Sequence, residues 1–239
     1  MKQISILGCG WLGFPLAKSL LEKGFSINGS TTSVEKITVL EKAGISPFQI
    51  NLFEDRIEGN LDLFLSNSNV LIIDIPPKLR GNSSDTSTAL SMTFVAKIQN
   101  IIPFIEKSSV EKVIFVSSTS VYSDDNAIIT EEMIPNPDTE SGKQLLEAEQ
   151  ILQSNSNFQT TIVRFGGLIG EDRHPIKFLA GRKNIENPEG PINLIHQVDC
   201  IGIIEAIIKK GVYFLCQHKL AQPDNWIWNQ DFNAVAPFH

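Results

Sequence analysis

The sequence contains few of the residues that mark several classes of protein. Its 239 residues include only three cysteines, Cys9, Cys200 and Cys216, and no two of them stand at the spacing of a metal site or a redox pair. Its 20 Lys and Arg residues are outnumbered by 27 Asp and Glu, and the net charge is −7. No apolar run approaches the roughly 18 residues of a membrane-spanning helix. These shortages argue against a disulfide framework, a nucleic-acid-binding surface and a membrane span, and they predict buried, reduced thiols.

Histidine and targeting signals are scarce too. We expect no bound metal ion, because no zinc-type spacing links the four histidines, which are His174, His196, His218 and His239. Met1 and Lys2 before an apolar stretch resemble the start of a signal peptide, and residues 6–9 resemble a lipoprotein cleavage box. The charged start is a single lysine, however, and the apolar segment before Cys9 is too short. We therefore expect no targeting segment and a cytoplasmic protein.

What the sequence does contain is a glycine-rich turn between an apolar strand and a helix. Residues 4–7 predict a buried strand, Gly8, Gly10 and Gly13 follow as Gly-x-Gly-x-x-Gly, and residues 14–21 have helical spacing. This order is typical of a dinucleotide-binding site. Gly8 would permit the tight turn, Gly10 would let the backbone approach a pyrophosphate, and Gly13 would let helix and strand pack closely.

The backbone N–H groups of this turn, including those of Trp11 and Leu12, are expected to face the phosphates at the positive end of the helix dipole. The alternative is an ordinary glycine-rich connection between a strand and a helix.

The rest of the chain alternates strands with helices. This rhythm predicts an α/β fold of the Rossmann type, a doubly wound parallel sheet with right-handed crossovers. Strands are expected at residues 4–7, 25–30, 48–52, 70–75, 113–116 and 161–165, with a last strand pattern within 226–236. Further helices are expected at 33–43, at 85–108 with a perturbation at Pro103, at 140–152 and at 199–210. We assign residues 1–165 to a dinucleotide-binding domain and 166–239 to a smaller region on its substrate side.

The segment after the second strand bears on the choice of cofactor. NAD-preferring sites place a carboxylate about 20 residues past the glycines. Here Thr31, Thr32 and Ser33 stand there, no carboxylate comes before Glu35, and Lys36 follows. Because hydroxyls and free N–H groups can receive a 2′-phosphate, NADP is favoured, although no arginine is present and NAD stays open. A Thr32–Glu35 capping box would explain the same residues without a ligand.

Four later motifs, taken in order with the glycine turn, resemble the NAD-dependent epimerase/dehydratase family, the extended branch of the short-chain dehydrogenase/reductase superfamily. They are residues 115–122 (Phe-Val-Ser-Ser-Thr-Ser-Val-Tyr), Lys143-x-x-x-Glu147, residues 163–170 (Val-Arg-Phe-Gly-Gly-Leu-Ile-Gly) and residues 193–199 (Asn-Leu-Ile-His-Gln-Val-Asp). The resemblance covers nearly the whole chain. It implies cofactor contacts at Asn51 and Leu52 beside the adenine, at Pro76 and Pro77 beside a ribose, and at Ser117.

The resemblance also implies a Ser/Thr, Tyr and Lys catalytic set that exchanges a proton while hydride passes to the nicotinamide. Ser118 takes the first role and Lys143 the third, where it would also bond the nicotinamide ribose. Thr139 stands at the position where the resemblance implies the tyrosine. An aliphatic hydroxyl is too weak an acid to replace a phenol of pKa about 10. The sequence thus resembles members of the family with an incomplete active site.

Other residues near these motifs have both structural and functional interpretations. The two tyrosines are Tyr122, expected to be structural, and Tyr213, expected in a C-terminal strand. Arg164 is expected to pair with a buried carboxylate, and His174 is the histidine most suited to face a substrate. His196 and Asp199 are expected to be scaffold, with Asp199 capping a helix. Ser118 could equally be a hydroxyl that bonds strand-end backbone.

Two functions follow from these residues. The first is an NADP(H)-dependent oxidoreductase or epimerase-like enzyme acting on a small hydroxylated metabolite or sugar nucleotide. The second is a non-catalytic NADP(H)-binding sensor or interaction module. We expect neither nucleic acid nor membrane as a partner, and the oligomeric state is open.

Overall fold

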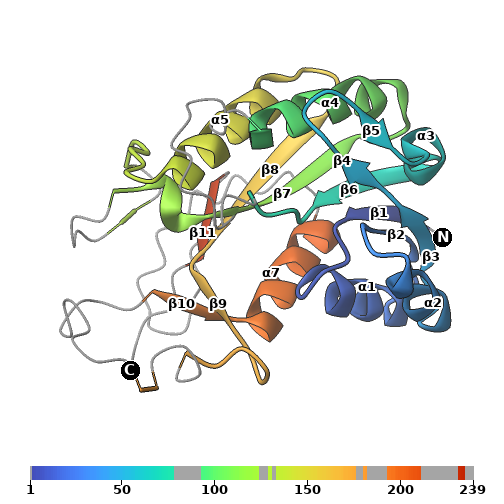
Figure 1. Cartoon of the computed structure of the whole chain (residues 1–239), viewed down its shortest axis with the longest axis horizontal. Helices are drawn as coiled ribbons and strands as arrows, with labels where there is room; N and C mark the ends of the chain where they lie inside the picture. Colours follow the sequence, from blue (N-terminus) through green and yellow to red (C-terminus); the bar gives the residue numbers. More distant parts are fainter. Residues whose placement is uncertain are drawn as a thin grey trace.

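The computed structural model describes residues 2–77, 93–123, 129–130, 133–175, 180–181, 193–210 and 231–234 (Figure 1). The strands are β1 (Gln3–Leu7), β2 (Ser26–Thr31), β3 (Ser46–Gln49), β4 (Asn51–Leu52), β5 (Ile57–Glu58), β6 (Ser68–Ile73), β7 (Lys112–Ser118), β8 (Gln159–Phe165), β9 (Gly167–Ile169), β10 (Leu194–His196) and β11 (Asp231–Ala234). The helices are α1 (Gly13–Glu22), α2 (Glu35–Lys42), α3 (Leu61–Leu65), α4 (Thr93–Lys107), α5 (Glu140–Ser154) and α7 (Gln197–Lys210), with a 3-10 turn η2 (Thr119–Val121).

Seven of the strands form one parallel sheet in the order β11-β8-β7-β6-β1-β2-β3. The chain begins at β1, moves outward to β2 and β3, and returns to β6 on the opposite side of β1. This is the doubly wound Rossmann-type arrangement that the sequence predicts. Ligands in such folds bind at the carboxyl ends of the strands where the order reverses, which here is the gap between β1 and β6.

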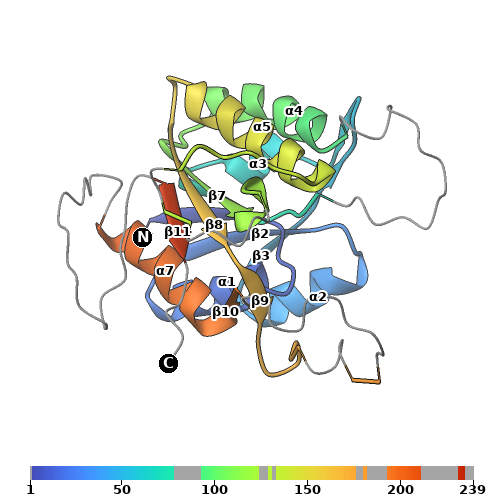
Figure 2. The same ribbon diagram turned by 90° about the vertical axis from the view of Figure 1, so that its left-hand side faces the viewer.

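Helices cover both faces of the sheet. Helices α1, α2 and α7 lie on one face and α3, α4 and α5 on the other (Figures 1 and 2). Neighbouring residues of one strand therefore point into different cores. Ile6 and Ile72 pack with α1 and α7, whereas Leu7, Ile73 and Phe115 pack with α3, α4 and α5. Burial on both faces explains the continuous apolar runs of these strands.

The region after β2 departs from the prediction in two ways. We expected one strand over residues 48–52, but the main sheet ends at Gln49 and Asn51–Leu52 pairs antiparallel with Ile57–Glu58. The chain leaves the sheet after Ile50, whose N–H donates to the Thr31 carbonyl at 3.1 Å. Helix α2 begins at Glu35 with no side-chain cap, so the Thr32–Glu35 capping box is not formed.

Two helices on the other face also differ from expectation. The sequence analysis missed α3, whose first turn is capped by the Asn60 side chain accepting from Leu63 N–H at 2.9 Å. Helix α4 continues through Pro103 to Lys107, because this proline lies on the exposed side of the helix. Residues 85–92 of the predicted helix lie outside the described residues.

Among the described parts of residues 166–239, one strand extends the main sheet and the other elements lie beside it. Strand β11 pairs with β8 in the main sheet, and α7 packs against α1, where the Ser19 hydroxyl donates to the Glu205 carboxylate at 2.5 Å. Strands β9 and β10 form a separate parallel pair. The boundary at residue 165 stays a prediction. Tyr213 and residues 226–229 lie outside the described part of the chain. Among the described helices, none combines the length and apolar character needed to cross a bilayer.

Candidate functional site

The glycine turn has the geometry that the sequence predicts for its first and third glycines. Gly8 has φ 109°, and a Cβ there would lie 2.2 Å from the Asp74 carbonyl oxygen. A Cβ at Gly13 would lie 2.2 Å from the Gly8 carbonyl oxygen, so α1 starts in direct contact with the end of β1. Strand β2 holds the turn, because Gly8 N–H donates to the Ser30 hydroxyl at 2.9 Å and Cys9 N–H to its carbonyl at 2.7 Å.

Gly10 differs from these two glycines. It is exposed, its φ is not in the left-handed region, and a Cβ built on it would meet no atom of the described residues within 4 Å. Packing within the protein therefore does not require glycine at this position. A ligand that comes close to the backbone would require a glycine here. The geometry of Gly10 therefore fits a bound dinucleotide.

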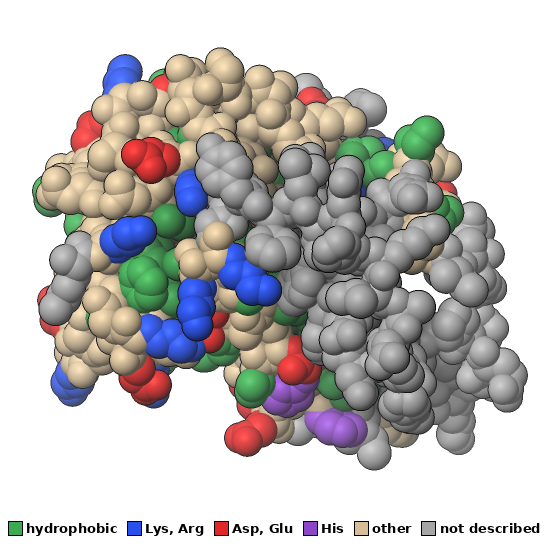
Figure 3. All heavy atoms as spheres, turned by 180° about the vertical axis from the view of Figure 1, so that it is seen from behind, with side chains coloured by type: hydrophobic (Ala, Val, Ile, Leu, Met, Phe, Trp, Pro, Cys, Tyr) green, Lys and Arg blue, Asp and Glu red, His purple; other side chains and the backbone are tan. Residues whose placement is uncertain are grey.

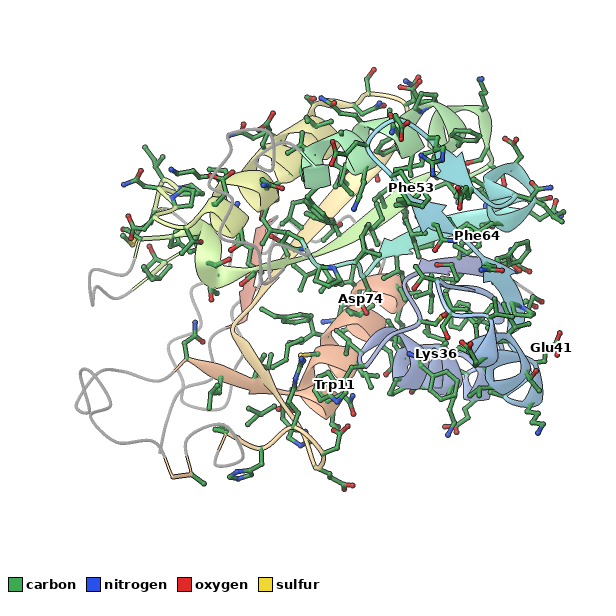
Figure 4. The ribbon with its side chains drawn as sticks, viewed as in Figure 1. Trp11, Lys36, Glu41, Phe53, Phe64 and Asp74 are labelled. Carbon is green, nitrogen blue, oxygen red and sulfur yellow. The ribbon has the colours of Figure 1, made fainter. Side chains whose placement is uncertain are left out.

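A cavity of about 230 Å³ opens beside this turn, at the carboxyl ends of β1, β2 and β6 and next to α2 and α4. The predicted cofactor residues that line it are Gly8, Gly10, Thr31, Thr32, Leu52 and Pro76. The remaining lining residues are Leu7, Cys9, Ser30, Lys36, Ile50, Asp74, Ile75, Phe94 and Lys97. Its walls thus combine glycine backbone, hydroxyls, apolar side chains, two lysines and one acidic side chain. Two of these residues, Lys36 and Asp74, are labelled in Figure 4.

Several predicted cofactor residues lie elsewhere in the described structure. Leu12 is buried in the core, Asn51 pairs with Glu58 in the hairpin, and Ser33 donates its hydroxyl to the exposed Glu35 carboxylate. That hydrogen bond lowers the pKa of Glu35. None of these residues, nor Gly13, Pro77 or Ser117, is among those that line the cavity.

Trp11 joins the glycine turn to the substrate-side region. Its indole N–H donates to Asp172 at 2.8 Å, and the Arg173 guanidinium lies 4.9 Å from the ring centroid. The Trp11 carbonyl accepts from the Gln197 amide at 2.7 Å, and Gly170 lies against the ring. The side chain of Trp11 therefore attaches this loop to the glycine turn, and the contact of its backbone N–H with a phosphate stays a prediction.

The three predicted catalytic residues have local structural roles or stand exposed. The Ser118 hydroxyl accepts from Ser120 N–H at 3.1 Å, and so caps η2. Thr139, which stands where the resemblance implies a tyrosine, is the N-cap of α5, and its hydroxyl accepts from Gly142 N–H at 3.1 Å. Lys143 is exposed one turn into the same helix. Both hydroxyls keep further hydrogen-bonding capacity, because each has one donor and two acceptor sites.

Helix α5 meets η2 at very close range. A Cβ on Gly142 would lie 2.1 Å from the Ser120 carbonyl oxygen and 2.8 Å from the Pro137 ring. The first turn of α5 is therefore packed backbone to backbone against the end of β7. Ser118 and Lys143 are brought to the same part of the fold by this contact.

Behind this contact lies a buried charged network. Arg164 is 4% exposed and Glu149 is 1% exposed, and their closest nitrogen and oxygen are 2.7 Å apart. Arg164 also donates to the Tyr122 hydroxyl at 2.9 Å, and the Ser117 hydroxyl donates to Glu149. The predicted pairing of Arg164 with a buried carboxylate is confirmed. The side chain of Ser117, predicted to bind cofactor, is directed to this network.

The remaining predictions concern histidines, Asp199 and cysteines. His174 is exposed and is not among the cavity-lining residues. His196 accepts from Val198 N–H at 3.3 Å, whereas Asp199 lies inside the first turn of α7, so the prediction that Asp199 caps this helix is wrong. The thiols of Cys9 and Cys200 are buried, and burial raises the pKa of each to about 12.

No group of metal-ligating side chains occurs among the described residues. Cys216, His218 and His239 lie outside them.

Sequence reasoning missed Asp74, Phe94 and Lys97 as lining residues. Asp74 had a usable signal, because it is a charged residue at the end of an otherwise apolar strand. Phe94 and Lys97 had none, since they lie on a helix without a motif and reach the cavity only through the packing of α4 on the sheet.

Comparison with known proteins agrees with this geometry. Residues 8–194 match the protein family described as NAD(P)H-binding. Protein YeeZ of Escherichia coli strain K12 is 31% identical over 221 residues, covering 90% of this chain and 78% of that protein.

Two solved structures show the same fold. UDP-glucuronic acid 4-epimerase from Bacillus cereus, in complex with UDP-glucuronic acid and NAD, matches with a TM-score of 0.72 at 17% identity, over 87% of this chain and 74% of that one. The UDP-Glc/GlcNAc 4-epimerase from Campylobacter jejuni matches with a TM-score of 0.66 at 15% identity, over 88% and 76%. The chain belongs to the NAD(P)H-binding family and shares the Rossmann-type fold of these two epimerases.

Proposed function

We propose that this protein is an NADP(H)-dependent oxidoreductase or epimerase-like enzyme that acts on a small hydroxylated metabolite or a sugar nucleotide. The observation that carries the proposal is Gly10. It lines the cavity, and its missing side chain leaves open space that no described atom fills. A diphosphate that approaches the N-terminus of α1 would use that space.

The cavity offers distinct surroundings to the other parts of the cofactor. Ile50, Leu52 and Phe94 provide apolar walls suited to an adenine ring. Thr32 and Lys36 lie where the adenosine ribose would follow, and a lysine there favours a 2′-phosphate over a free hydroxyl. Although the chain carries a net charge of −7, Lys and Arg side chains gather around a hydrophobic patch on the face seen in Figure 3. Such local positive charge suits an anionic ligand.

The cofactor, when bound, supplies or accepts a hydride. The Ser118 hydroxyl, which keeps a free donor after capping η2, would orient the substrate oxygen, and Lys143 would place a positive charge beside it. Neither group replaces the phenol that relatives of this type use as acid and base. We therefore expect slow turnover, because proton transfer to and from the substrate oxygen is less effective without a tyrosine.

A second candidate function, an NADP(H) sensor without turnover, is favoured by one observation. Thr139 and Ser118 both cap backbone N–H groups, so the hydroxyls at the predicted catalytic positions already have structural tasks. A protein of this kind would bind the cofactor and respond to its redox state through a partner.

Ligand titration tests the cofactor assignment. We expect purified protein to bind NADPH more tightly than NADH, and Lys36→Gln to weaken NADPH binding about tenfold while leaving NADH nearly unchanged. Lys42→Gln, in the last turn of the same helix, is the matched control and should change neither. Equal loss of both cofactors on Lys36→Gln would contradict the 2′-phosphate contact, and binding of neither cofactor by the wild type would remove the proposal.

Turnover separates the two functions. Incubation with NADPH and a panel of carbonyl compounds and nucleotide sugars should show slow oxidation that Lys143→Ala abolishes. Intact NADPH binding without turnover across the panel would favour the sensor.

A further inference from the structure

One partly buried acidic residue that lines the cavity has no part in the function described so far. Asp74 directly follows β6, and its N–H donates to the Leu7 carbonyl at 2.9 Å, which fixes it beside the end of β1. Its carbonyl oxygen fills the space that a side chain on Gly8 would need, and its Oδ2 lies 3.0 Å from the Cβ position of Gly13. The carboxyl group thus sits between the glycine turn and the first turn of α1 (Figure 4).

The surroundings of this carboxyl group disfavour its charge. Burial raises the pKa of Asp74 to about 7, and the hydrogen bond from Gly13 N–H offsets only part of that rise. No ion pair of the described residues includes it, although Lys36 on α2 and Lys97 on α4 line the same cavity. The other titratable neighbours are the thiols of Cys9 and of Cys200 on α7, which stay neutral near pH 7, with Asp199 beside Cys200.

A dinucleotide diphosphate would compete with Asp74 for the same positive helix end. The negative charges of the diphosphate would lie close to the carboxylate in a partly enclosed cavity, and like charges disfavour ionisation of both. A neutral carboxyl removes this repulsion. It also gains an O–H donor, which can serve a phosphate or ribose oxygen.

We propose that Asp74 is the proton-linked residue of the cofactor site: the dinucleotide binds the form of the protein in which this carboxyl group is neutral, and binding takes up one proton from solvent. This inference rests on the proposed function, because it requires the diphosphate at the glycine turn. One O–H bond forms on Asp74, and no other bond changes.

The direction of the pH effect follows from this linkage. Below about pH 7 the carboxyl group is already neutral in the free protein, and Asp74 adds no pH dependence. Above that pH the free protein must be protonated on binding, so the dissociation constant rises with pH by up to about tenfold per unit. The 2′-phosphate of NADPH loses its second proton at about pH 6 and adds its own pH dependence to binding. A variant without the Asp74 carboxyl group separates this contribution from that of Asp74.

The experiment compares NADPH binding to the wild type and to Asp74→Asn between pH 6 and 8.5. We expect the wild-type affinity to fall by about tenfold more than that of Asp74→Asn between pH 7 and 8.5. Asp199→Asn, which removes the neighbouring carboxylate of α7, is the matched control and should keep the wild-type profile. Calorimetry of the wild type alone, in two buffers of different ionisation enthalpy at pH 8, should show uptake of nearly one proton.

The calorimetric result does not depend on any variant folding. Identical pH profiles of wild type and Asp74→Asn, or NADPH binding without proton uptake at pH 8, would overturn the role of Asp74 while leaving the proposed function standing. Absence of NADPH binding at every pH, in the wild type as well as the variant, would overturn both.

Discussion

We call the carboxyl ends of β1, β2 and β6 the cofactor half and the segment from β7 to α5 the catalytic half, after the roles proposed for them. The two halves use similar small polar residues in different ways. In the cofactor half, Gly10, Thr32 and Lys36 face a cavity, and no described hydrogen bond engages the side chains of Thr32 or Lys36. In the catalytic half, the hydroxyls of Ser118 and Thr139 each accept a backbone N–H of the turn that they begin.

This difference teaches what a hydroxyl needs before it can serve a ligand. A serine or threonine at the end of a strand or the start of a helix bonds the backbone whenever a donor is in reach. In the glycine turn, by contrast, the N–H groups of Trp11 and Leu12 make no hydrogen bond within the described part of the chain, and these are the groups that we expect a ligand to use. The catalytic half is thus built first for stability, and any reaction must use the hydrogen-bonding capacity that remains.

The largest expected effect is a loss of stability from a substitution in the catalytic half that leaves NADPH binding intact. Glu149→Gln leaves the Arg164 guanidinium buried without its carboxylate, and breaking such a pair costs about 3–5 kcal/mol. In thermal unfolding we expect a fall of about 10 °C in Tm, against little change for the exposed Glu147→Gln on the same helix. NADPH binding below the transition should persist, because the cavity-lining residues run from Leu7 to Lys97. A loss of binding in step with the loss of stability would break the comparison.

The next largest expected effect is a loss of NADPH affinity with no change in stability. Gly10→Ala adds a methyl group to open space, so the folded protein should keep its Tm, while a ligand packed on the backbone would be displaced. We expect NADPH affinity to fall by about tenfold to a hundredfold. Gly202→Ala also meets open space, on the exposed side of α7, and is the matched control: it should leave binding unchanged and raise stability by up to about 1 kcal/mol. Unchanged affinity in Gly10→Ala would show that nothing approaches this glycine.

The same contrast explains what the sequence could predict. The structure confirms the doubly wound parallel sheet, the geometry of Gly8 and Gly13, and the pairing of Arg164. The first two follow from local sequence pattern, and the third follows because a buried charge needs an opposite one. The cavity walls contributed by Phe94 and Lys97 could not be predicted, because α4 carries no motif and its rotation on the sheet is set by packing.

Prediction also failed where two hydrogen-bonding solutions compete. Residues 48–52 have strand-like composition throughout, but the chain turns away after Ile50 to form the hairpin of β4 and β5. The Ser33 hydroxyl bonds Glu35, and no side chain caps α2. Such choices depend on neighbours that are distant in sequence, and a local pattern does not contain them.

The smallest effect tests Thr139 itself. Thr139→Ala removes the N-cap of α5 and should cost about 1 kcal/mol, or about 2–4 °C in Tm, whereas Thr139→Ser keeps the acceptor and should be nearly neutral. Thr139→Tyr would supply the phenol that the resemblance implies at this position but lose the same cap, because a phenolic oxygen cannot reach the N–H of its own helix turn as a short hydroxyl does. Its turnover should therefore be compared with that of Thr139→Ala, which is matched for the lost cap. Activity in Thr139→Tyr alone would show that Lys143 and Ser118 are placed for the reaction and lack only an acid, whereas equal inactivity of both variants would mean that the catalytic half is shaped by the capping role in more than this one residue.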